Sequence, residues 1–216
     1  LSRIESTKIL NKAVLNCKNP PKHWLNSSTA TIYRFSLDKQ MDEVDGEIGN
    51  DFSINVALSW EKAFFKTETP NTLKTALRTS IVLGKNGGAF IPLKNLAKTG
   101  FGGKQGSGNQ FVSWIHEDDF ANAAAFIIEK EISGIINVVS PEPVQNTVFM
   151  QKLRKSVGFP FGIPLNKFFL EIGAFFIRTE PELILKSRNV VPKRLLENGF
   201  QFKFGDIDTA FRNLLR

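Results

Sequence analysis

Hydrophobic and polar residues follow two alternating patterns along the chain. Apolar runs without strict polar alternation are typical of strands buried on both faces, and they occupy residues 23–28, 73–84, 111–115 and 133–140. Between these runs, apolar residues recur at the spacing of a helical face, over residues 1–17, 51–66, 116–131 and 147–158, and a short helix follows a glycine turn within 85–100. The alternation predicts an α/β protein with a mostly parallel sheet that is covered on both faces.

The pattern changes after residue 145. Strand-like runs stop there, and helical spacing continues at 165–177, at 181–187 and in the last ten residues. We therefore expect two parts: residues 1–145, which hold the sheet, and residues 146–216, a smaller and mostly helical lobe.

Polar residues at the starts of helices predict where those helices begin. Asp51 is expected to cap the 51–66 helix, Asn146 to cap the 147–158 helix, and Asp118 or Asp119 to cap the 116–131 helix. The predicted apolar face of the 51–66 helix is made by Phe52, Val56, Trp60, Ala63 and Phe64.

The first helix also bears on how the chain begins. Residues 1, 4, 10, 13, 14 and 17 are apolar and lie close to one helical face. The chain starts with Leu1 rather than Met, inside this amphipathic pattern. We therefore expect it to have been cut from a longer protein.

The composition excludes several kinds of site. Of 216 residues, 42% are hydrophobic and twenty are phenylalanine, which suits a folded core. Cys17 is the only cysteine, so an internal disulfide is impossible, and two histidines leave too few soft ligands for structural zinc. No metal is predicted. A reducing, cytoplasmic setting is favoured, and no apolar stretch reaches the roughly 20 residues that span a bilayer.

The net charge of +7 has two interpretations. It can be a solvated surface, or it can attract an anionic partner. Lysine and arginine are spread along the chain without a block of five or six, and no nucleic-acid-binding motif is present. No nucleic acid is therefore predicted as a partner, whereas a phosphorylated small molecule would suit the charge.

Five stretches carry a family resemblance, by their order and spacing. They are NSSTATIY (26–33), ALRTSIVLG (76–84), GGKQGSGNQFVSWIHEDDFA (102–121), GIINVVSPEPVQN (134–146) and SRNVVPKRLLENGFQFKF (187–204). Together they resemble the extended short-chain dehydrogenase/reductases, in particular the atypical NAD(P)-dependent epimerase-like subgroup with its own helical C-terminal domain. The resemblance implies a Rossmann-like doubly wound sheet that binds NADP or NAD, with NADP preferred. It also implies a small polar or nucleotide-linked substrate held by the C-terminal lobe, in a monomer or homodimer.

The family's glycine-rich dinucleotide fingerprint is not found. It belongs on the first strand–helix turn, where a helix N-terminus takes the pyrophosphate. The chain has no GxGxxG after a strand, and GGKQGSG leads into a strand instead. We therefore expect the N-terminal half of the nucleotide domain to be missing, and dinucleotide binding by this chain alone to be weak.

The NSSTATIY segment supplies the first candidate site residues. In the family, the hydroxyl residue four positions before the tyrosine points at the substrate, which is Thr29 here. A hydroxyl there can stabilise charge that develops on a substrate oxygen; alternatively, Thr29 bonds local backbone in a turn. The resemblance places Ser27 and Ser28 against the cofactor. Tyr33 either contacts substrate or packs beneath the pocket, and it is not the proton-transfer tyrosine.

The family's proton-transfer pair, Tyr-x-x-x-Lys, is absent. Counting back from Glu61, its two positions fall at Ser53 and Ala57, neither of which can act as a general base. This departure puts ordinary dehydrogenase or epimerase chemistry in doubt. Glu61 is either a surface charge or a buried partner for Arg78, and Trp60 is most simply a core residue.

Further candidates come from three loops and strand ends. Thr79 and Ser80 are candidate cofactor contacts, because the resemblance places them beside the nicotinamide. Gly88 lies where a helix begins and can face a substrate phosphate or simply form a glycine turn. Lys104 and Gln110 lie in a glycine-rich loop that either covers the substrate or has no ligand at all.

The last candidates are charged or titratable residues near the cleft of relatives. His116 can orient substrate, although a capping or packing role is the alternative. Arg188 and Lys193 can reach into the cleft, but a surface role is the simpler interpretation.

Two functions remain open on the sequence. One is an NAD(P)-dependent oxidoreductase or epimerase-like protein in which Thr29 polarises a substrate oxygen. The other is a non-catalytic nucleotide-sensing or interaction module on the same fold, which the missing Tyr-x-x-x-Lys pair favours.

Overall fold

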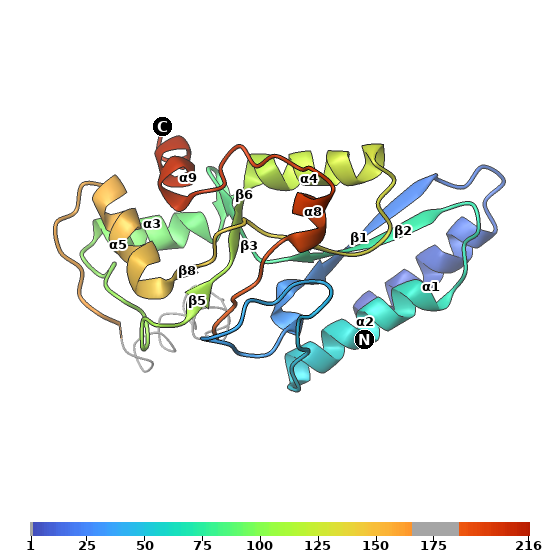
Figure 1. Ribbon diagram of the computed structural model, residues 1–216, viewed down its shortest axis with the longest axis horizontal. Helices are drawn as coiled ribbons and strands as arrows, with labels where there is room; N and C mark the ends of the chain where they lie inside the picture. Colours follow the sequence, from blue (N-terminus) through green and yellow to red (C-terminus); the bar gives the residue numbers. More distant parts are fainter. Residues whose placement is uncertain (1, 166–185) are drawn as a thin grey trace.

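Figure 1 shows the architecture of the chain, a computed structural model that describes residues 2–165 and 186–216. Helices α1 and α2 lie on one side of β1 and β2, and α4 lies on the other side. The described elements run, in order, α1 (Ser2–Leu15), β1 (His23–Thr29), η1 (Ala30–Ile32), α2 (Phe52–Lys66), β2 (Leu73–Thr79), β3 (Ile81–Gly84), β4 (Gly87–Gly88), α3 (Phe90–Lys98), β5 (Phe111–Val112), β6 (Trp114–His116), α4 (Glu117–Glu129), β7 (Gly134–Val138), β8 (Val144–Gln145), α5 (Asn146–Ser156), α8 (Lys193–Glu197) and α9 (Ile207–Leu214).

A parallel sheet with the strand order β1-β2-β7 positions the rest of the molecule. Parallel neighbours need a crossover connection, and α2 supplies it between β1 and β2. Ile136 of β7 is fully buried in a cluster with Ile127 of α4, while Ala57 of α2 is buried on the opposite side. The prediction of a mostly parallel sheet covered on both faces is confirmed.

Two segments predicted as single strands each form two strands. At Ser80 the chain leaves the first sheet: β2 pairs with β1 and β7, whereas β3 pairs with β4 and β6. At Ser113 it changes partners again, because β5 pairs with β8 and β6 pairs with β3. The single-strand predictions are wrong, since an apolar run does not reveal which partner each residue will pair with. Part of the predicted loop before residue 146 is the short strand β8.

The first helix packs through polar residues rather than through an apolar face. Thr7 is 2% exposed and Asn11 is fully buried, whereas Leu10 is half exposed. The Thr7 hydroxyl accepts a hydrogen bond from Trp60 Nε1 (2.8 Å), and Asn11 Nδ2 donates to the Ala63 carbonyl (3.0 Å). The predicted apolar face is therefore wrong for this helix, because side-chain hydrogen bonds attach α1 to α2.

The buried face of α2 is rotated from the predicted one. Ala63 and Phe64 are buried as expected, but Phe52 is 85% exposed and Trp60 is only half-buried. Ile54 and Glu61 are buried instead. The buried face of α2 therefore includes the charged residue Glu61, which hydrophobic spacing alone does not place there.

Asp51 caps α2 as predicted, which leads to a prediction about acid stability. Its carboxylate accepts hydrogen bonds from Ile54 N (2.9 Å), Ser53 Oγ (2.8 Å) and Lys186 Nζ (2.6 Å). The bond from Lys186, followed by that from Ile54 N–H, holds the pKa of Asp51 well below its usual range. A carboxyl with a depressed folded pKa stabilises the fold above its unfolded pKa of about 3.9, and that stabilisation is lost as the pH falls.

We expect Asp51→Ala to lower the free energy of unfolding by about 1 kcal/mol at neutral pH. The difference from wild type should shrink as the pH falls below about 4, because protonation weakens the same contacts in wild type. Urea unfolding across this pH range measures it. Asp51→Asn keeps a capping oxygen without the charge, so its free energy of unfolding should be closer to that of wild type. A loss of stability in Asp51→Ala that stayed constant with pH would contradict the role of the Asp51 charge.

Two other predicted caps are replaced by different contacts. At α4, His116 is the cap: its Nδ1 accepts a hydrogen bond from Asp118 N (3.0 Å). Asp119 instead accepts from the backbone N–H groups of Lys203 (2.9 Å) and Phe204 (2.8 Å), which attaches the C-terminal segment to α4. Asn146 is the first residue of α5 and bonds the Gln105 backbone instead of capping (2.8 Å).

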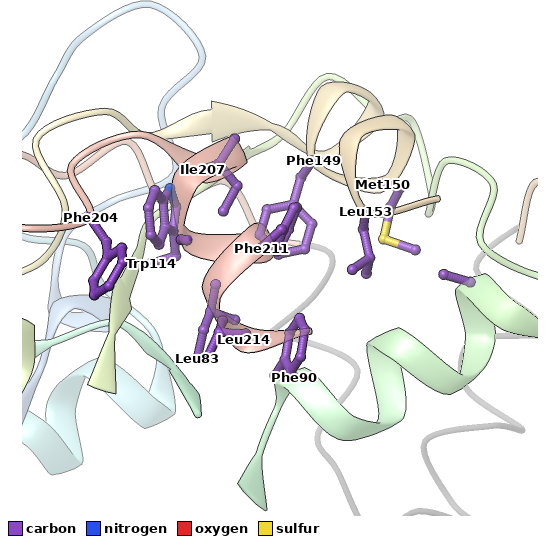
Figure 2. Packing of buried hydrophobic residues seen from close by; sticks show 12 residues of the cluster. Leu83, Phe90, Trp114, Phe149, Met150, Leu153, Phe204, Ile207, Phe211 and Leu214 are labelled. Atoms are coloured by element: carbon purple, nitrogen blue, oxygen red, sulfur yellow. The ribbon is translucent and has the colours of Figure 1, made fainter. Parts of the chain in front are cut away.

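The C-terminal elements share a core with the strands. Figure 2 shows Phe211 of α9 beside Phe149 of α5 and Phe90 of α3, in a buried cluster that also contains Leu83 of β3 and Trp114 of β6. This cluster draws side chains from both sides of residue 145. The predicted helix in the last ten residues is confirmed as α9, whereas the helices predicted over 165–177 and 181–187 lie almost wholly outside the described residues.

Candidate functional site

A cavity of about 330 Å³ lies where β1 and β2 end. Its described wall consists of Thr29, Ala30, Thr31, Thr79, Ser80, Ile81, Val82, Gly88, Ala89, Phe111, Val112, Ser113 and Arg188. In open α/β sheets, ligands bind outside the carboxyl ends of the strands. Both sheet-partner changes, at Ser80 and Ser113, occur in this wall, so the departure of the strands from one another opens the space.

The wall combines hydroxyl groups with one guanidinium. Among its described residues, the hydroxyl groups come from Thr29, Thr31, Thr79, Ser80 and Ser113, and the charged side chain is that of Arg188. The other wall residues are apolar or glycine. Such a wall suits a small ligand that offers polar or anionic groups on one side and a flat or apolar surface on the other.

Thr29 ends β1 and lines the cavity, and it also bonds local backbone. Its Oγ1 accepts a hydrogen bond from Thr31 N (3.2 Å), which starts the turn η1, and lies 2.9 Å from Thr31 Oγ1. A hydroxyl has one donor and two acceptor positions. If Thr31 donates in the second contact, both acceptor positions of Thr29 are filled and its own proton points to a third group. The local turn and a ligand-directed hydroxyl are therefore compatible.

Three other sequence candidates meet Thr29 in the wall: Thr79, Ser80 and Gly88. Ser80 Oγ is buried and has no hydrogen-bond partner among the described residues, which is costly for a hydroxyl unless a ligand or water bonds to it. Gly88 has φ +64°, and a Cβ there would lie 3.2 Å from the Val82 carbonyl oxygen. This position therefore requires glycine.

A buried polar network lies next to the cavity, and it includes Ser28 and Arg78, which directly precede Thr29 and Thr79 in the chain. Glu61 of α2 accepts two hydrogen bonds from Arg78 of β2, from Nε to Oε1 (2.9 Å) and from Nη2 to Oε2 (2.8 Å), and a third from Ser28 Oγ. Arg78 Nη1 also donates to Tyr33 Oη (3.0 Å), which donates to Asn137 Oδ1 (3.0 Å). Glu61 is thus the buried partner of Arg78, one of the two alternatives left open by the sequence.

Tyr33 cannot supply a phenolate near neutral pH from this network. Burial raises its pKa, although the neighbouring Arg78 charge and hydrogen bond act in the opposite direction. Ser53 and Ala57, at the positions of the Tyr-x-x-x-Lys pair, lie in the first turns of α2; Ser53 bonds Asp51, and Ala57 is buried. Among the described wall residues, none has a side chain that serves as a general base near pH 7.

The structure does not bring six of the sequence candidates to the cavity wall. Ser28 and Tyr33 belong to the buried network, and Ser27 is exposed on β1. Lys104 is exposed in its loop, while Gln110 is buried and its Nε2 donates to the Gln105 carbonyl (2.7 Å).

The sixth, His116, is buried by contacts within the protein. Its Nδ1 caps α4, its Nε2 lies 3.1 Å from Asn213 Oδ1, and its ring stacks on Phe204 with centroids 4.0 Å apart. These contacts correspond to the capping and packing alternative. They attach the C-terminal helix α9 to the end of β6.

The sequence does not predict three of the polar residues in the described wall. Thr31 could have been predicted, since a second hydroxyl two positions after Thr29 is typical of a local turn. For Ser113 the sequence offers less, because its only distinguishing feature is that it is a lone serine within an apolar run. Arg188 was expected at the surface, but it is 9% exposed and lines the cavity. Lys193 does lie at the surface, 3.5 Å from Asp42.

Residues 2–165 and 186–216 contain no group of three or more His, Cys, Asp or Glu side chains placed to hold a metal ion. Across the same residues, no helix has the length and apolar character needed to cross a membrane.

Comparisons with known proteins give relatives across almost the whole chain. The human "Epimerase family protein SDR39U1" is 32% identical over 215 residues, covering 99% of this chain and 72% of that protein. The Bacillus subtilis "Epimerase family protein YfhF" is 30% identical over 220 residues, covering 99% of this chain and 70% of its own length. A family model described as a domain of unknown function, DUF1731, matches residues 167–214.

Solved structures agree with these sequence matches. A crystal structure of human SDR39U1 (isoform 2) with NADPH has a TM-score of 0.90 at 32% identity, covering 99% of this chain and 72% of that one. A nucleoside-diphosphate sugar epimerase from Corynebacterium glutamicum has a TM-score of 0.80 at 28% identity, covering 99% of this chain and 41% of that one.

Proposed function

Because the chain belongs to the epimerase family of short-chain dehydrogenase/reductases that includes human SDR39U1, we propose that it is an NAD(P)-dependent oxidoreductase or epimerase-like protein. Its substrate is a small polar or nucleotide-linked molecule that enters the cavity at the ends of β1 and β2. The observation that carries the proposal is the position of Thr29, whose hydroxyl lines this cavity while Thr31 N–H fills one of its acceptor positions.

The cofactor proposed is NADP, with NAD as the alternative. The NADPH-bound human relative supports this choice. The hydroxyl groups of Thr79 and Ser80 suit a carboxamide or ribose, because Ser80 can both donate and accept, and Thr79, which donates to the Leu77 carbonyl (3.3 Å), keeps acceptor positions. The buried, unpartnered Ser80 Oγ is a polar group for which such a ligand would provide a bond. When bound, a nicotinamide supplies the hydride acceptor or donor.

Thr29 would act on the substrate oxygen. If Thr31 donates in the contact between the two hydroxyl groups, the Thr29 proton is directed to the ligand, where it would stabilise negative charge on a carbonyl or carbinol oxygen. The network of Glu61 and Arg78 would keep the end of β1 in place, since Ser28 directly precedes Thr29 and bonds Glu61. Thr29 is thus the proposed catalytic residue.

A second candidate function has support of its own. The positions of the family's proton-transfer pair are Ser53 and Ala57, and the described wall has no general base. A protein that binds the nucleotide but turns over nothing, and acts as a nucleotide-sensing or interaction module, would have the same features. Substrate turnover separates the two candidates, whereas nucleotide binding does not.

Titration of the complete gene product with NADPH and NADH is the first test, because weak dinucleotide binding is expected of this chain alone. We expect saturable enhancement of nicotinamide fluorescence, stronger for NADPH, and a rise in melting temperature with nucleotide concentration. A panel of small carbonyl compounds is then screened for NADPH oxidation. Thr29→Val should lower kcat by about 10²- to 10³-fold, the usual effect of removing one donor to a developing oxyanion, without weakening NADPH binding.

Thr99→Val is the matched control. Thr99 is exposed at the end of α3 and lies outside the cavity wall, so this variant should keep wild-type kinetics. Binding of neither nucleotide by the folded complete gene product would refute the proposal. NADPH binding without turnover of any compound would favour the sensing module.

A further inference from the structure

The cavity holds a buried arginine that comes from a distant part of the sequence. Arg188 is 9% exposed and forms part of the wall together with Thr29 and Thr79. It lies more than 100 residues after both of them in the chain. Folding therefore brings this guanidinium to the place where β1 and β2 end.

The backbone around Arg188 is fixed from several directions. Arg188 N donates to the Phe111 carbonyl (2.8 Å), and the Arg188 carbonyl accepts from Ser113 Oγ (2.6 Å). On either side, Phe111 N donates to Ser187 Oγ (2.9 Å) and Val190 N donates to Ser113 Oγ (3.0 Å). The segment that carries the guanidinium is therefore ordered before any ligand arrives, which lowers the entropic cost of binding.

The chemistry of the wall indicates what this guanidinium can bind. An arginine has five N–H donors, and it can serve protein partners, such as the Ser187 carbonyl at 3.4 Å, while binding a ligand as well. The described wall contains no carboxylate, and its other polar side chains are hydroxyl groups. Guanidinium groups bind carboxylate and phosphate through paired, charge-assisted hydrogen bonds.

The size of the cavity restricts the ligand further. About 330 Å³ is near the lower end of the range for small-molecule pockets. Because Thr79 and Ser80 are assigned to the cofactor, Thr29 is the residue left to bind a hydroxyl or carbonyl group of the substrate, and Phe111 and Ile81 offer apolar surface. A compact hydroxylated carbon skeleton with one anionic group would satisfy both kinds of polar residue in the wall.

We propose that Arg188 is a specificity-determining residue, which selects a small hydroxylated substrate bearing one carboxylate or phosphate, of the kind found in sugar acids and sugar phosphates. The inference rests on the proposed function, because it names the substrate class of the same cavity. Arg188 binds the oxyanion, and Thr29 binds a hydroxyl or carbonyl oxygen of the same substrate.

The test uses three probes that differ in the anionic group: gluconate, glucose 6-phosphate and glucose. Calorimetric titration and thermal shift measure their binding to the wild-type chain and to Arg188→Gln, Arg188→Lys and Lys193→Met. Lys193→Met is the matched control, because it removes a positive charge near Arg188 in sequence but at the surface, beside Asp42. Circular dichroism confirms that each variant is folded.

We expect wild type to bind at least one anionic probe more tightly than glucose, and the more tightly bound of the two identifies the anion as carboxylate or phosphate. Arg188→Gln should lower the affinity for that anionic probe by roughly ten- to a hundredfold, which is the loss typical of removing one charged hydrogen-bonding group. Arg188→Lys should recover part of the affinity, because lysine keeps the charge but loses the paired geometry. Lys193→Met should match wild type.

Equal affinity of wild type for all three probes, no binding of either anion, or equal losses in Arg188→Gln and Lys193→Met would each overturn the proposal. NADPH titration of the same variants separates this outcome from failure of the proposed function. Retained NADPH binding with no anion selectivity refutes only the role of Arg188. Anion selectivity without binding of either nucleotide refutes instead the proposal that the protein binds NADP or NAD.

Discussion

Arg78→Met is expected to lower the free energy of unfolding by about 3–5 kcal/mol, because it leaves the Glu61 carboxylate buried without its cation. Glu61 and Arg78 are 6% and 5% exposed, and two hydrogen bonds of 2.9 and 2.8 Å join them. After the substitution, Glu61 keeps only the hydroxyl of Ser28 as a described partner. The total free energy of unfolding of a small domain is about 5–15 kcal/mol. A loss of this size is therefore a large part of the stability.

A double variant distinguishes the buried charge from lost packing. Glu61→Met combined with Arg78→Met removes both charges and restores apolar volume, so we expect it to recover much of the loss. Urea unfolding of wild type, both single variants and the double variant gives the coupling energy. Losses in the single variants that simply add up would show that the two side chains do not interact energetically, contrary to the geometry.

Phe211→Ala is expected to cost about 3–5 kcal/mol, the usual range for truncating a buried phenylalanine. Phe211 is fully buried, with its ring centroid 6.0 Å from that of Phe90 and 5.1 Å from that of Phe149. Figure 2 shows it between α3, α5 and the strands, so the cavity left by alanine would separate elements from both halves of the chain. Urea unfolding measures the loss.

Phe52→Ala provides a matched control for the same chemical change. Phe52 is 85% exposed, so its truncation should alter the stability by no more than about 0.5 kcal/mol. Because the cluster around Phe211 joins α9 to β3 and β6, we also expect Phe211→Ala to unfold in a single transition. A separate early transition of the C-terminal elements would show instead that they form an independent unit.

Local sequence determined more of the sheet than of the site. The apolar runs predicted a mostly parallel sheet, because strands buried on both faces exclude polar alternation. The sequence offers Glu61 as a possible buried partner of Arg78, and the structure confirms this contact. Thr29, Thr79, Ser80 and Gly88 were candidates that the fold does bring together, since parallel strands end at the same edge.

Long-range contacts decided the remaining features of the site. Arg188 reaches the cavity only because the segment around it pairs with β5 and Ser113, some 75 residues earlier in the chain. His116 and Asp119 are held by contacts with Asn213, Lys203 and Phe204, so their side chains serve the attachment of the C-terminal segment.

Residue patterns therefore predict the fold class and the residues at the strand ends, because hydrophobic periodicity and strand direction are local properties. Contacts between distant segments determine where strands change partners, at Ser80 and Ser113, and which polar side chains form hydrogen bonds within the protein. Strand partners and the hydrogen bonds of these side chains depend on contacts between residues far apart in the chain. The spacing of neighbouring residues does not predict such contacts.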